Sequence, residues 1–304
     1  MFGKRTVVDM INRSAENDAD RRNFLRTAGI AGLGVVGAGT ASGMLGSAAS
    51  AAPSDAAVLN FALNLEYLEA EFYSHAVFGR GLDPALTTGK GDRGGVVGGR
   101  EVKFSSNTIR TTAREIARDE IDHVRFLRAA LGSAKVSRPK INLRNSFTAA
   151  ARAAGLIGPN DTFDPYANED NFLLAAFIFE DVGVTAYKGA APLITNKAYL
   201  EAAAGILAVE AYHAGIVRTN LYNKGLMVAA RKISDARDSL DGDTSLDQGI
   251  GTQKRVNLVP TDMNGIAFSR TPGQVLNVVY LTPKSVNRGG FFPDGVNGAV
   301  RRSS

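Results

Sequence analysis

Two copies of the motif Glu-x-x-His constrain the possible fold of this chain more than any other feature of its sequence. Glu120 precedes His123 by three residues, and ninety residues later Glu210 precedes His213 in the same way. The chain has only three histidines and 11 glutamates in 304 residues, so chance is a poor explanation for the shared spacing. On an α-helix, residues i and i+3 lie on one face with Cβ atoms about 5–6 Å apart. Each motif therefore predicts a helix that directs a carboxylate and an imidazole to one point.

Hydrophobic residues recur at helical spacing around both motifs and in two further segments. The four predicted helices, with their end residues, run from Ser54 or Asp55 to Gly79, from Ser105 or Ser106 to Gly132, from Asn168 to around Pro192, and from Asn196 to about Lys232. The Gly-rich residues 79–104 predict a long loop, and residues 133–167 are long enough to cross from one end of a bundle to the other. The predicted fold class is all-α, a four-helix bundle with a long crossover between the second and third helices.

The first and third predicted helices share a second repeated element, a glutamate followed by a tyrosine seven residues later. Glu66 precedes Tyr73, and Glu180 precedes Tyr187. Seven residues make two helical turns, so each glutamate shares a face with its tyrosine. The chain therefore reads as a twofold internal repeat of helix pairs. Both glutamates lie in strongly apolar segments, where a lone carboxylate is costly to bury unless it is paired or binds a cation.

These motifs together predict a metal site built from four glutamates and two histidines. The predicted ligands are Glu66, Glu120, His123, Glu180, Glu210 and His213. Carboxylate oxygen and imidazole nitrogen suit iron or manganese. One glutamate from each of two helices plus Glu-x-x-His from each of the other two is the ligand set of bundles that bind two metal ions. The predicted cofactors are two Fe or Mn ions. A single Glu-x-x-His motif on its own has a competing interpretation, because a glutamate and a histidine at this spacing also form ordinary ion pairs on a helix surface.

Several residues near these motifs have more than one interpretation. Tyr73 and Tyr187 are either core aromatics whose hydroxyls reach a carboxylate, or catalytic residues in radical or electron transfer. Glu69, one turn after Glu66, is either a further carboxylate ligand or a residue behind the ligands or at the surface, and the second is favoured because the equivalent Gly183 carries no acidic side chain. Glu71 points roughly 140° away from Glu66 on a helical wheel and is expected to be solvated. Asp119 lies off the ligand face of its helix, and whether it contacts a histidine ligand is left undecided by the sequence.

The helical motifs resemble those of the ferritin-like superfamily over residues 55–230, with the six predicted ligands on the six ligand positions of that family. The start of the first helix, LNFALNLEYLEAEFY, looks like the export-associated branch, the desiccation-related proteins of bacteria and plants. Two later segments are similar to C-terminal segments of that branch, SRTPGQVLNVVYLTP and GGFFPDGVNG. The resemblance implies a ferritin-like bundle. It does not imply a hollow cage, because the 79–104 loop and the tail exceed the minimal iron-storage bundle.

The resemblance implies three candidate functions. The first is a di-metal oxidoreductase that oxidises Fe(II) or consumes O2 or peroxide in stress protection. The second is a non-catalytic desiccation or envelope protein with a structural metal site, and the third is a manganese-type catalase. The ligand set alone does not separate iron from manganese, because both metals accept it. Metal ions and O2 or peroxide are the expected partners, with a homo-oligomer left open.

The N-terminal residues are similar to a twin-arginine export signal. Arg21 and Arg22 precede Phe24 and Leu25, and a weakly apolar Gly/Ala-rich run follows, ending in the small-residue pattern at Ala51. This predicts export by the twin-arginine route to the periplasm, envelope or exterior, with no membrane span after cleavage. The predicted division is an export signal at 1–51, a bundle at 52–231, and a loop-rich extension packed on the bundle at 232–304.

Composition excludes several classes of site. The chain has no cysteine, so disulfides, thiolate metal sites and a cysteine nucleophile are excluded. The net charge is +5, of which residues 1–51 carry +2, and the remainder has no lysine or arginine runs. This is poor evidence for nucleic-acid binding. In the extension, Thr271 and Gln274 form a capping-box pattern with Pro272 between them, which predicts a short helix through Tyr280.

Overall fold

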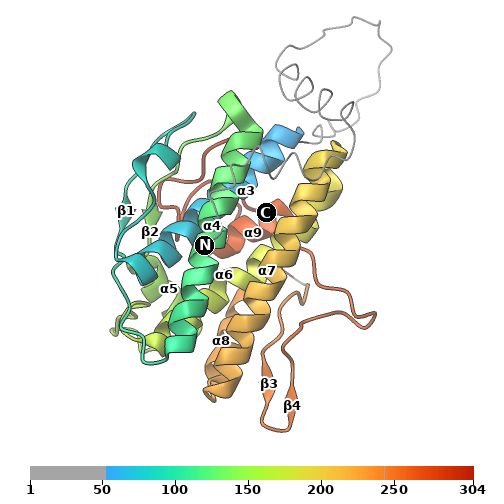
Figure 1. Ribbon diagram of the computed structural model, residues 1–304. Helices are drawn as coiled ribbons and strands as arrows, with labels where there is room; N and C mark the ends of the chain where they lie inside the picture. Colours follow the sequence, from blue (N-terminus) through green and yellow to red (C-terminus); the bar gives the residue numbers. More distant parts are fainter. Residues whose placement is uncertain (1–52, 243) are drawn as a thin grey trace, which may run out of the picture.

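Four long helices form the centre of the protein. The computed structural model describes residues 53–242 and 244–304, so the predicted export signal lies outside the described residues. The four helices are α3 (Asp55–Phe78), α4 (Asn107–Leu131), α6 (Glu169–Ala190) and α7 (Lys197–Asn223). α3 packs mainly against α4, and α6 mainly against α7 (Figure 1). The crossover between the two pairs is residues 132–168. The prediction of an all-α four-helix bundle with a long crossover between the second and third long helices is therefore confirmed.

The ends of the four helices follow local capping chemistry. The side chains of Ser54, Ser106, Asn168 and Asn196 each accept a hydrogen bond from a backbone N–H in the first turn. Gly79 ends α3 in the left-handed region, with φ of 66°, where a side chain would be strained. These predicted boundaries are confirmed.

The fourth helix is shorter than the sequence predicts. α7 ends at Asn223, Gly225 has a φ of 74°, and a separate helix α8 (Met227–Asp238) follows. The prediction of one helix to about Lys232 is wrong, because a residue with positive φ cannot continue a right-handed helix. The break turns α8 back against α6, where Arg237 Nη2 donates to Asp181 Oδ2 at 2.8 Å.

Helices α3 and α6 are covered on nearly all sides. Every residue from 58 to 74 in α3 and from 172 to 183 in α6 is buried. A helix that is apolar around its whole circumference belongs inside a protein. The segments that connect the long helices contain the short elements η1 (Pro84–Leu86), β1 (Val96–Val97), η2 (Gly132–Ala134), β2 (Ile141–Asn142), α5 (Asn145–Ala153) and η3 (Ala191–Leu193). β1 and β2 pair in parallel, which ties the 79–104 loop to the crossover.

Glu71 shows the consequence of this covering. Its side chain is fully buried, pairs with the guanidinium of Arg138 from the crossover, and accepts from the Leu82 backbone N–H at 3.2 Å. The prediction that Glu71 is solvated is wrong. The helical wheel correctly turns it away from Glu66, but the side it faces is occupied by the loop and the crossover instead of water.

The C-terminal extension packs on the bundle, mostly as irregular chain. It contains the short hairpin β3 (Gly251–Thr252) and β4 (Arg255–Val256), and the helix α9 (Pro272–Tyr280) that begins with the predicted capping box. Phe291 is buried with its ring centroid 4.9 Å from those of Phe147 in α5 and Phe179 in α6. Arg270 is also fully buried and pairs with Asp241 and Asp247.

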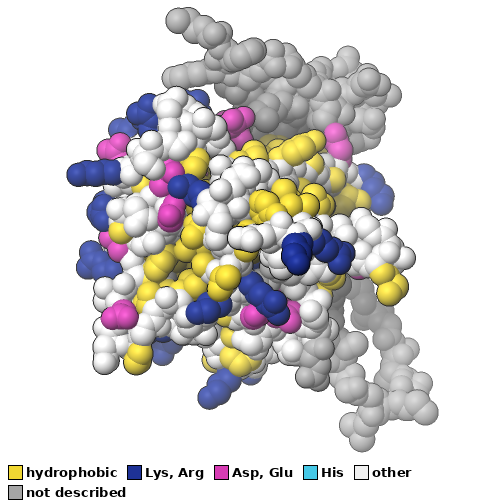
Figure 2. All heavy atoms as spheres, turned by 90° about the horizontal axis from the view of Figure 1, so that it is seen from below, with side chains coloured by type: hydrophobic (Ala, Val, Ile, Leu, Met, Phe, Trp, Pro, Cys, Tyr) yellow, Lys and Arg dark blue, Asp and Glu magenta, His cyan; other side chains and the backbone are white. Residues whose placement is uncertain are grey.

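α7 is the one helix in the described part of the chain that is long and apolar enough to cross a membrane, judged by length and composition. Those two criteria are weak evidence, because a core helix also meets them. Here α7 packs against α6 and buries Glu210, His213 and Arg218, so it is a helix of the bundle. On the face seen in Figure 2, lysine and arginine side chains lie scattered among acidic and apolar ones, without a continuous basic stripe.

Candidate metal centre

The six predicted ligands meet at the middle of the bundle, all buried. They come from all four long helices: Glu66 from α3, Glu120 and His123 from α4, Glu180 from α6, and Glu210 and His213 from α7. Their ligand atoms fall into two overlapping groups, within each of which the atoms lie no more than 4.8 Å apart. The groups are Glu66, Glu120, His123 and Glu210, and Glu120, Glu180 and His213. The assignment of these residues as ligands stays a prediction, while their convergence is a property of the fold.

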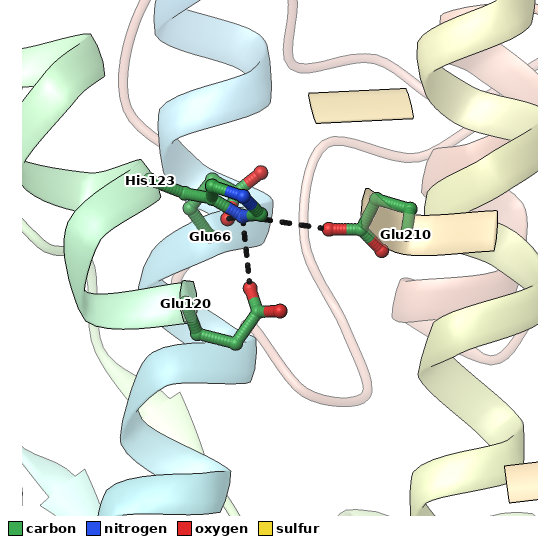
Figure 3. A group of neighbouring side chains, drawn as sticks. All are labelled: Glu66, Glu120, His123 and Glu210. Atoms are coloured by element: carbon green, nitrogen blue, oxygen red, sulfur yellow. Dashed lines mark hydrogen bonds and ion pairs between the residues drawn. The ribbon is translucent and has the colours of Figure 1, made fainter. Parts of the chain in front are cut away.

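The first group is arranged around the δ nitrogen of His123. Nδ1 lies 3.2 Å from Glu66 Oε2, 3.6 Å from Glu120 Oε2 and 3.7 Å from Glu210 Oε1 (Figure 3). Figure 3 shows Glu66, Glu120 and Glu210 approaching this imidazole from three different helices. Three carboxylates around one imidazole nitrogen make a ligand set for one divalent ion.

The second group is arranged around the δ nitrogen of His213. Nδ1 lies 3.1 Å from Glu120 Oε1 and 3.6 Å from Glu180 Oε2. Glu120 thus approaches both histidines, one with each carboxylate oxygen. The centroids of the His123 and His213 rings are 6.5 Å apart. Glu120 therefore lies between the two groups.

The two tyrosines of the repeat hold the carboxylates of the opposite helix pair. The Tyr73 hydroxyl in α3 donates to Glu180 Oε1 in α6, and the Tyr187 hydroxyl in α6 donates to Glu66 Oε1 in α3. Burial raises the pKa of both tyrosines well above its usual value, so both stay protonated donors. Each bond leaves the Oε2 atom of its glutamate facing the centre. The structure therefore shows hydroxyls that reach carboxylates, and the catalytic assignment of the tyrosines stays a prediction.

Asp119 supports only one of the two histidines. Its Oδ2 lies 3.1 Å from His213 Nε2, and its side chain is 42% exposed. A carboxylate at Nε2 holds a proton there and leaves the Nδ1 lone pair free to bind a metal. The position that corresponds to Asp119 in the second motif is Val209, which offers no such partner to His123. The contact that the sequence left open is present, and it makes the two halves of the site unequal.

Glu69 is a fifth glutamate beside the centre. It is buried, and its ligand atoms group with those of Glu180 and Glu210. Gly183 stands at the equivalent position in the second half of the repeat, and a Cβ atom there would overlap Glu210 Oε2. A surface position for Glu69 is therefore wrong, while its role as a ligand or as a residue behind the ligands stays a prediction. The missing side chain at Gly183, which argues against a matching ligand in the second half of the repeat, leaves room for carboxylates from other helices.

The site is electrostatically unusual for a protein core. Burial raises the pKa of Glu66 to about 7 and of Glu180 to about 8. Burial also acts to raise the pKa of Glu120, but His123 and His213 outweigh it and leave that pKa below its usual value. Burial lowers the pKa of His213, while Glu180 and the bond to Asp119 raise it to a net value of about 10. The carboxylates therefore share protons and imidazolium charge that a metal ion has to displace.

The pattern of unsatisfied atoms fits a metal. Several buried side-chain atoms of the site have no hydrogen-bond partner within the described residues, and the ion pairs they make are with other members of the site. These atoms are both oxygens of Glu120, both of Glu210, Glu180 Oε2 and His213 Nδ1. Buried polar atoms are normally satisfied, and a set of orphaned ligand atoms facing one space calls for an explanation. Each of the two groups offers several carboxylate oxygens and one imidazole nitrogen, a combination that suits iron or manganese. The residues present therefore fit a metal centre.

Comparison with known proteins agrees with this geometry. The family model described as ferritin-like domain matches residues 54–223. The chain is 33% identical over 267 residues to the desiccation-related protein PCC13-62 of Craterostigma plantagineum, covering 81% of this chain and 83% of that protein. It is 30% identical over 273 residues to the ferritin-like catalase Nec2 of Nesocodon mauritianus, covering 82% and 85%. No solved structure matches. The resemblance drawn from the sequence is confirmed, and the chain belongs to the ferritin-like domain family, in its desiccation-related branch.

Proposed function

We propose that this protein binds two iron or manganese ions in the candidate metal centre and acts as an exported oxidoreductase on peroxide, O2 or Fe(II). The observation that carries the proposal is the set of buried, orphaned carboxylate and imidazole atoms facing one space. Glu66 and His123 would hold one ion, and Glu180 and His213 the other. Glu120 and Glu210 would lie between them. Bound ions of this kind would supply a two-electron change for a small oxidant.

The residues around the ligands have distinct tasks in this proposal. Tyr73 and Tyr187 orient the terminal carboxylates by donating to their Oε1 atoms. Asp119 holds a proton on His213 Nε2 and so keeps Nδ1 directed at the centre. The surrounding apolar side chains exclude water, which strengthens the electrostatic interactions inside the site.

The depth at which the predicted ligands are buried favours a small substrate. Glu66 is 2% exposed, and Glu120, Glu180 and Glu210 are fully buried. A peroxide or O2 molecule can approach such a centre more readily than a large organic substrate. The similarity to a protein named a ferritin-like catalase supports the same class of reaction.

The decisive experiment measures metal content and turnover on protein folded in the cytoplasm. Iron and manganese are quantified per chain. Samples loaded anaerobically with Fe(II) are then mixed with O2 or peroxide, and manganese-loaded samples with peroxide. Rapid oxidation or O2 release that is lost in Glu120→Gln supports the proposal. Glu115→Gln, an exposed change on the same helix, is the matched control. A stoichiometric metal without turnover supports the non-catalytic envelope protein instead, and absence of metal overturns both.

Export has its own test. We expect a double change of Arg21 and Arg22 to lysine to retain the protein in the cytoplasm, because the twin-arginine route recognises that pair. Arg26→Lys keeps a basic residue at its position and should leave export intact. Fractionation with immunodetection measures both variants. Normal export of the double variant would remove this route from the proposal.

A further inference from the structure

A second possible ligand site lies on the surface, outside the metal centre. The C-terminal end of α3, the segment 80–86 and the middle of α4 enclose a cleft of about 790 Å³. Its size is within the range of clefts that bind small organic molecules. None of the six predicted metal ligands lines it.

The wall formed by segment 80–86 is held in place by buried groups. The Leu82 backbone N–H donates to the fully buried Glu71 at 3.2 Å. Arg128 of α4 donates to the carbonyls of Ala85 at 3.0 Å and Thr88 at 2.6 Å. Gly81 lies so close to Glu71 that a Cβ atom would overlap it. The cleft is therefore formed before any ligand arrives, which lowers the entropic cost of binding.

One polar group at the cleft lacks a partner. Ser74 of α3 lines the cleft, is only 2% exposed, and its hydroxyl has no hydrogen-bond partner among the described residues. A buried hydroxyl without a partner is costly, and a ligand acceptor would satisfy it. This hydroxyl marks the inner end of the cleft as polar.

The charged residues at the rim are unevenly paired. Two carboxylates and three guanidinium groups line the cleft. Arg125 forms an ion pair with Asp122 at 2.6 Å, and Asp83 Oδ1 accepts from a backbone N–H at 2.9 Å. Arg80 and Arg118 also line the cleft, and neither makes an ion pair with another residue in the described part of the chain. Two guanidinium groups without carboxylate partners beside one cleft favour an anion, because arginine binds carboxylate and phosphate in a bidentate manner.

The remaining lining is largely apolar. Its apolar side chains are Phe78 from α3, Leu82 and Leu86 from the segment 80–86, and Ile121 from α4. Phe78 is 37% exposed, which is unusual for a phenylalanine and leaves a ring face available. The cleft thus combines an apolar surface with unpaired cationic groups.

We propose that this cleft binds a small organic anion, a molecule with a carboxylate or phosphate group on an apolar body. Arg80 and Arg118 hold the anionic group, Ser74 donates its hydroxyl, and Phe78 and Ile121 contact the apolar body. The proposal is independent of the metal centre.

Titration calorimetry on the full chain tests the proposal, with phenyl phosphate and benzoate as probes. Both should bind with dissociation constants in the millimolar range, as expected for ligands of this size. Arg80→Gln or Arg118→Gln should weaken binding about tenfold, because a charge-assisted hydrogen bond is lost. Ser74→Ala should weaken binding by a smaller factor without lowering the melting temperature, because its hydroxyl has no partner in the free protein.

The matched control is Arg110→Gln, an exposed arginine of the same helix that does not line the cleft. It should leave the affinity for both probes unchanged. Benzyl alcohol, which lacks the charge, and inorganic phosphate, which lacks the apolar body, should bind more weakly. Failure of both organic anions to bind overturns the proposal. Equal binding of benzyl alcohol, equal binding of inorganic phosphate, or an unchanged affinity in Arg118→Gln overturns it too.

Discussion

Replacing His213 with alanine is the most informative perturbation of the metal centre. In the parent, His213 Nδ1 lies 3.1 Å from Glu120 Oε1 and 3.6 Å from Glu180 Oε2. The substitution removes the only nitrogen ligand of that half and leaves the carboxylates in place. Metal content after anaerobic loading with Fe(II) should therefore fall from about two ions per chain to about one.

The same substitution should destabilise the metal-free protein. Removing one partner of a buried ion pair costs about 3–5 kcal/mol. The lower end is expected here, because the carboxyl of Glu180, with a pKa raised by burial to about 8, can take up a proton instead. A loss of about 3 kcal/mol lowers the melting temperature of a protein this size by about 6–12 °C.

Two measurements decide the outcome, namely metal per chain and the thermal unfolding of metal-free protein. His75→Ala is the control, because His75 lies at the end of α3 beside Glu71 and away from the centre. It should retain the metal content of the parent. The reasoning is refuted if His213→Ala binds as much iron or manganese as the parent, or if the two variants lose metal alike.

Three further predictions follow from the geometry. Asp119→Asn should weaken metal affinity about 10–100-fold without removing a ligand, as measured by competition with a chelator; an unchanged affinity contradicts the role given to Asp119. Gly183→Ala should displace Glu210 and lower the free energy of unfolding by about 1–3 kcal/mol, as measured by urea unfolding. A variant with the stability and the metal content of the parent would contradict this. Burial raises the pKa values of Glu66 and Glu180 above those of the unfolded chain. Metal-free protein should therefore lose stability as pH rises from about 5 to 8. Urea unfolding at several pH values measures this, and a free energy of unfolding that increases over this range would contradict the prediction.

The starts of the four long helices and the convergence of the Glu-x-x-His residues are predictable from the spacing of residues along the chain. The first residues of the four long helices follow from side chains that cap backbone groups a few positions away, such as Ser106 and Asn168. The pairing of Glu120 with His123 follows from the helical repeat alone. Both are local properties, so the spacing of residues along the chain suffices to predict them.

Other features depend on which segments pack together. Tyr73 donates to Glu180 on another helix, and no spacing within one helix predicts that partner. Only the packing of the four helices against one another brings Glu69 beside Glu180. The break at Gly225 was also missed, since an isolated glycine in a helical pattern is often tolerated.

Glu71 gives the physical reason for this division. Its place on the helical wheel sets its direction relative to Glu66, and the sequence is sufficient for that. Whether that direction leads to water or to Arg138 depends on the crossover, a segment more than 60 residues away. The spacing of residues predicts the direction of each side chain on its helix. What that side chain meets depends on the segments packed around the helix, because those segments set its burial and its charged partners.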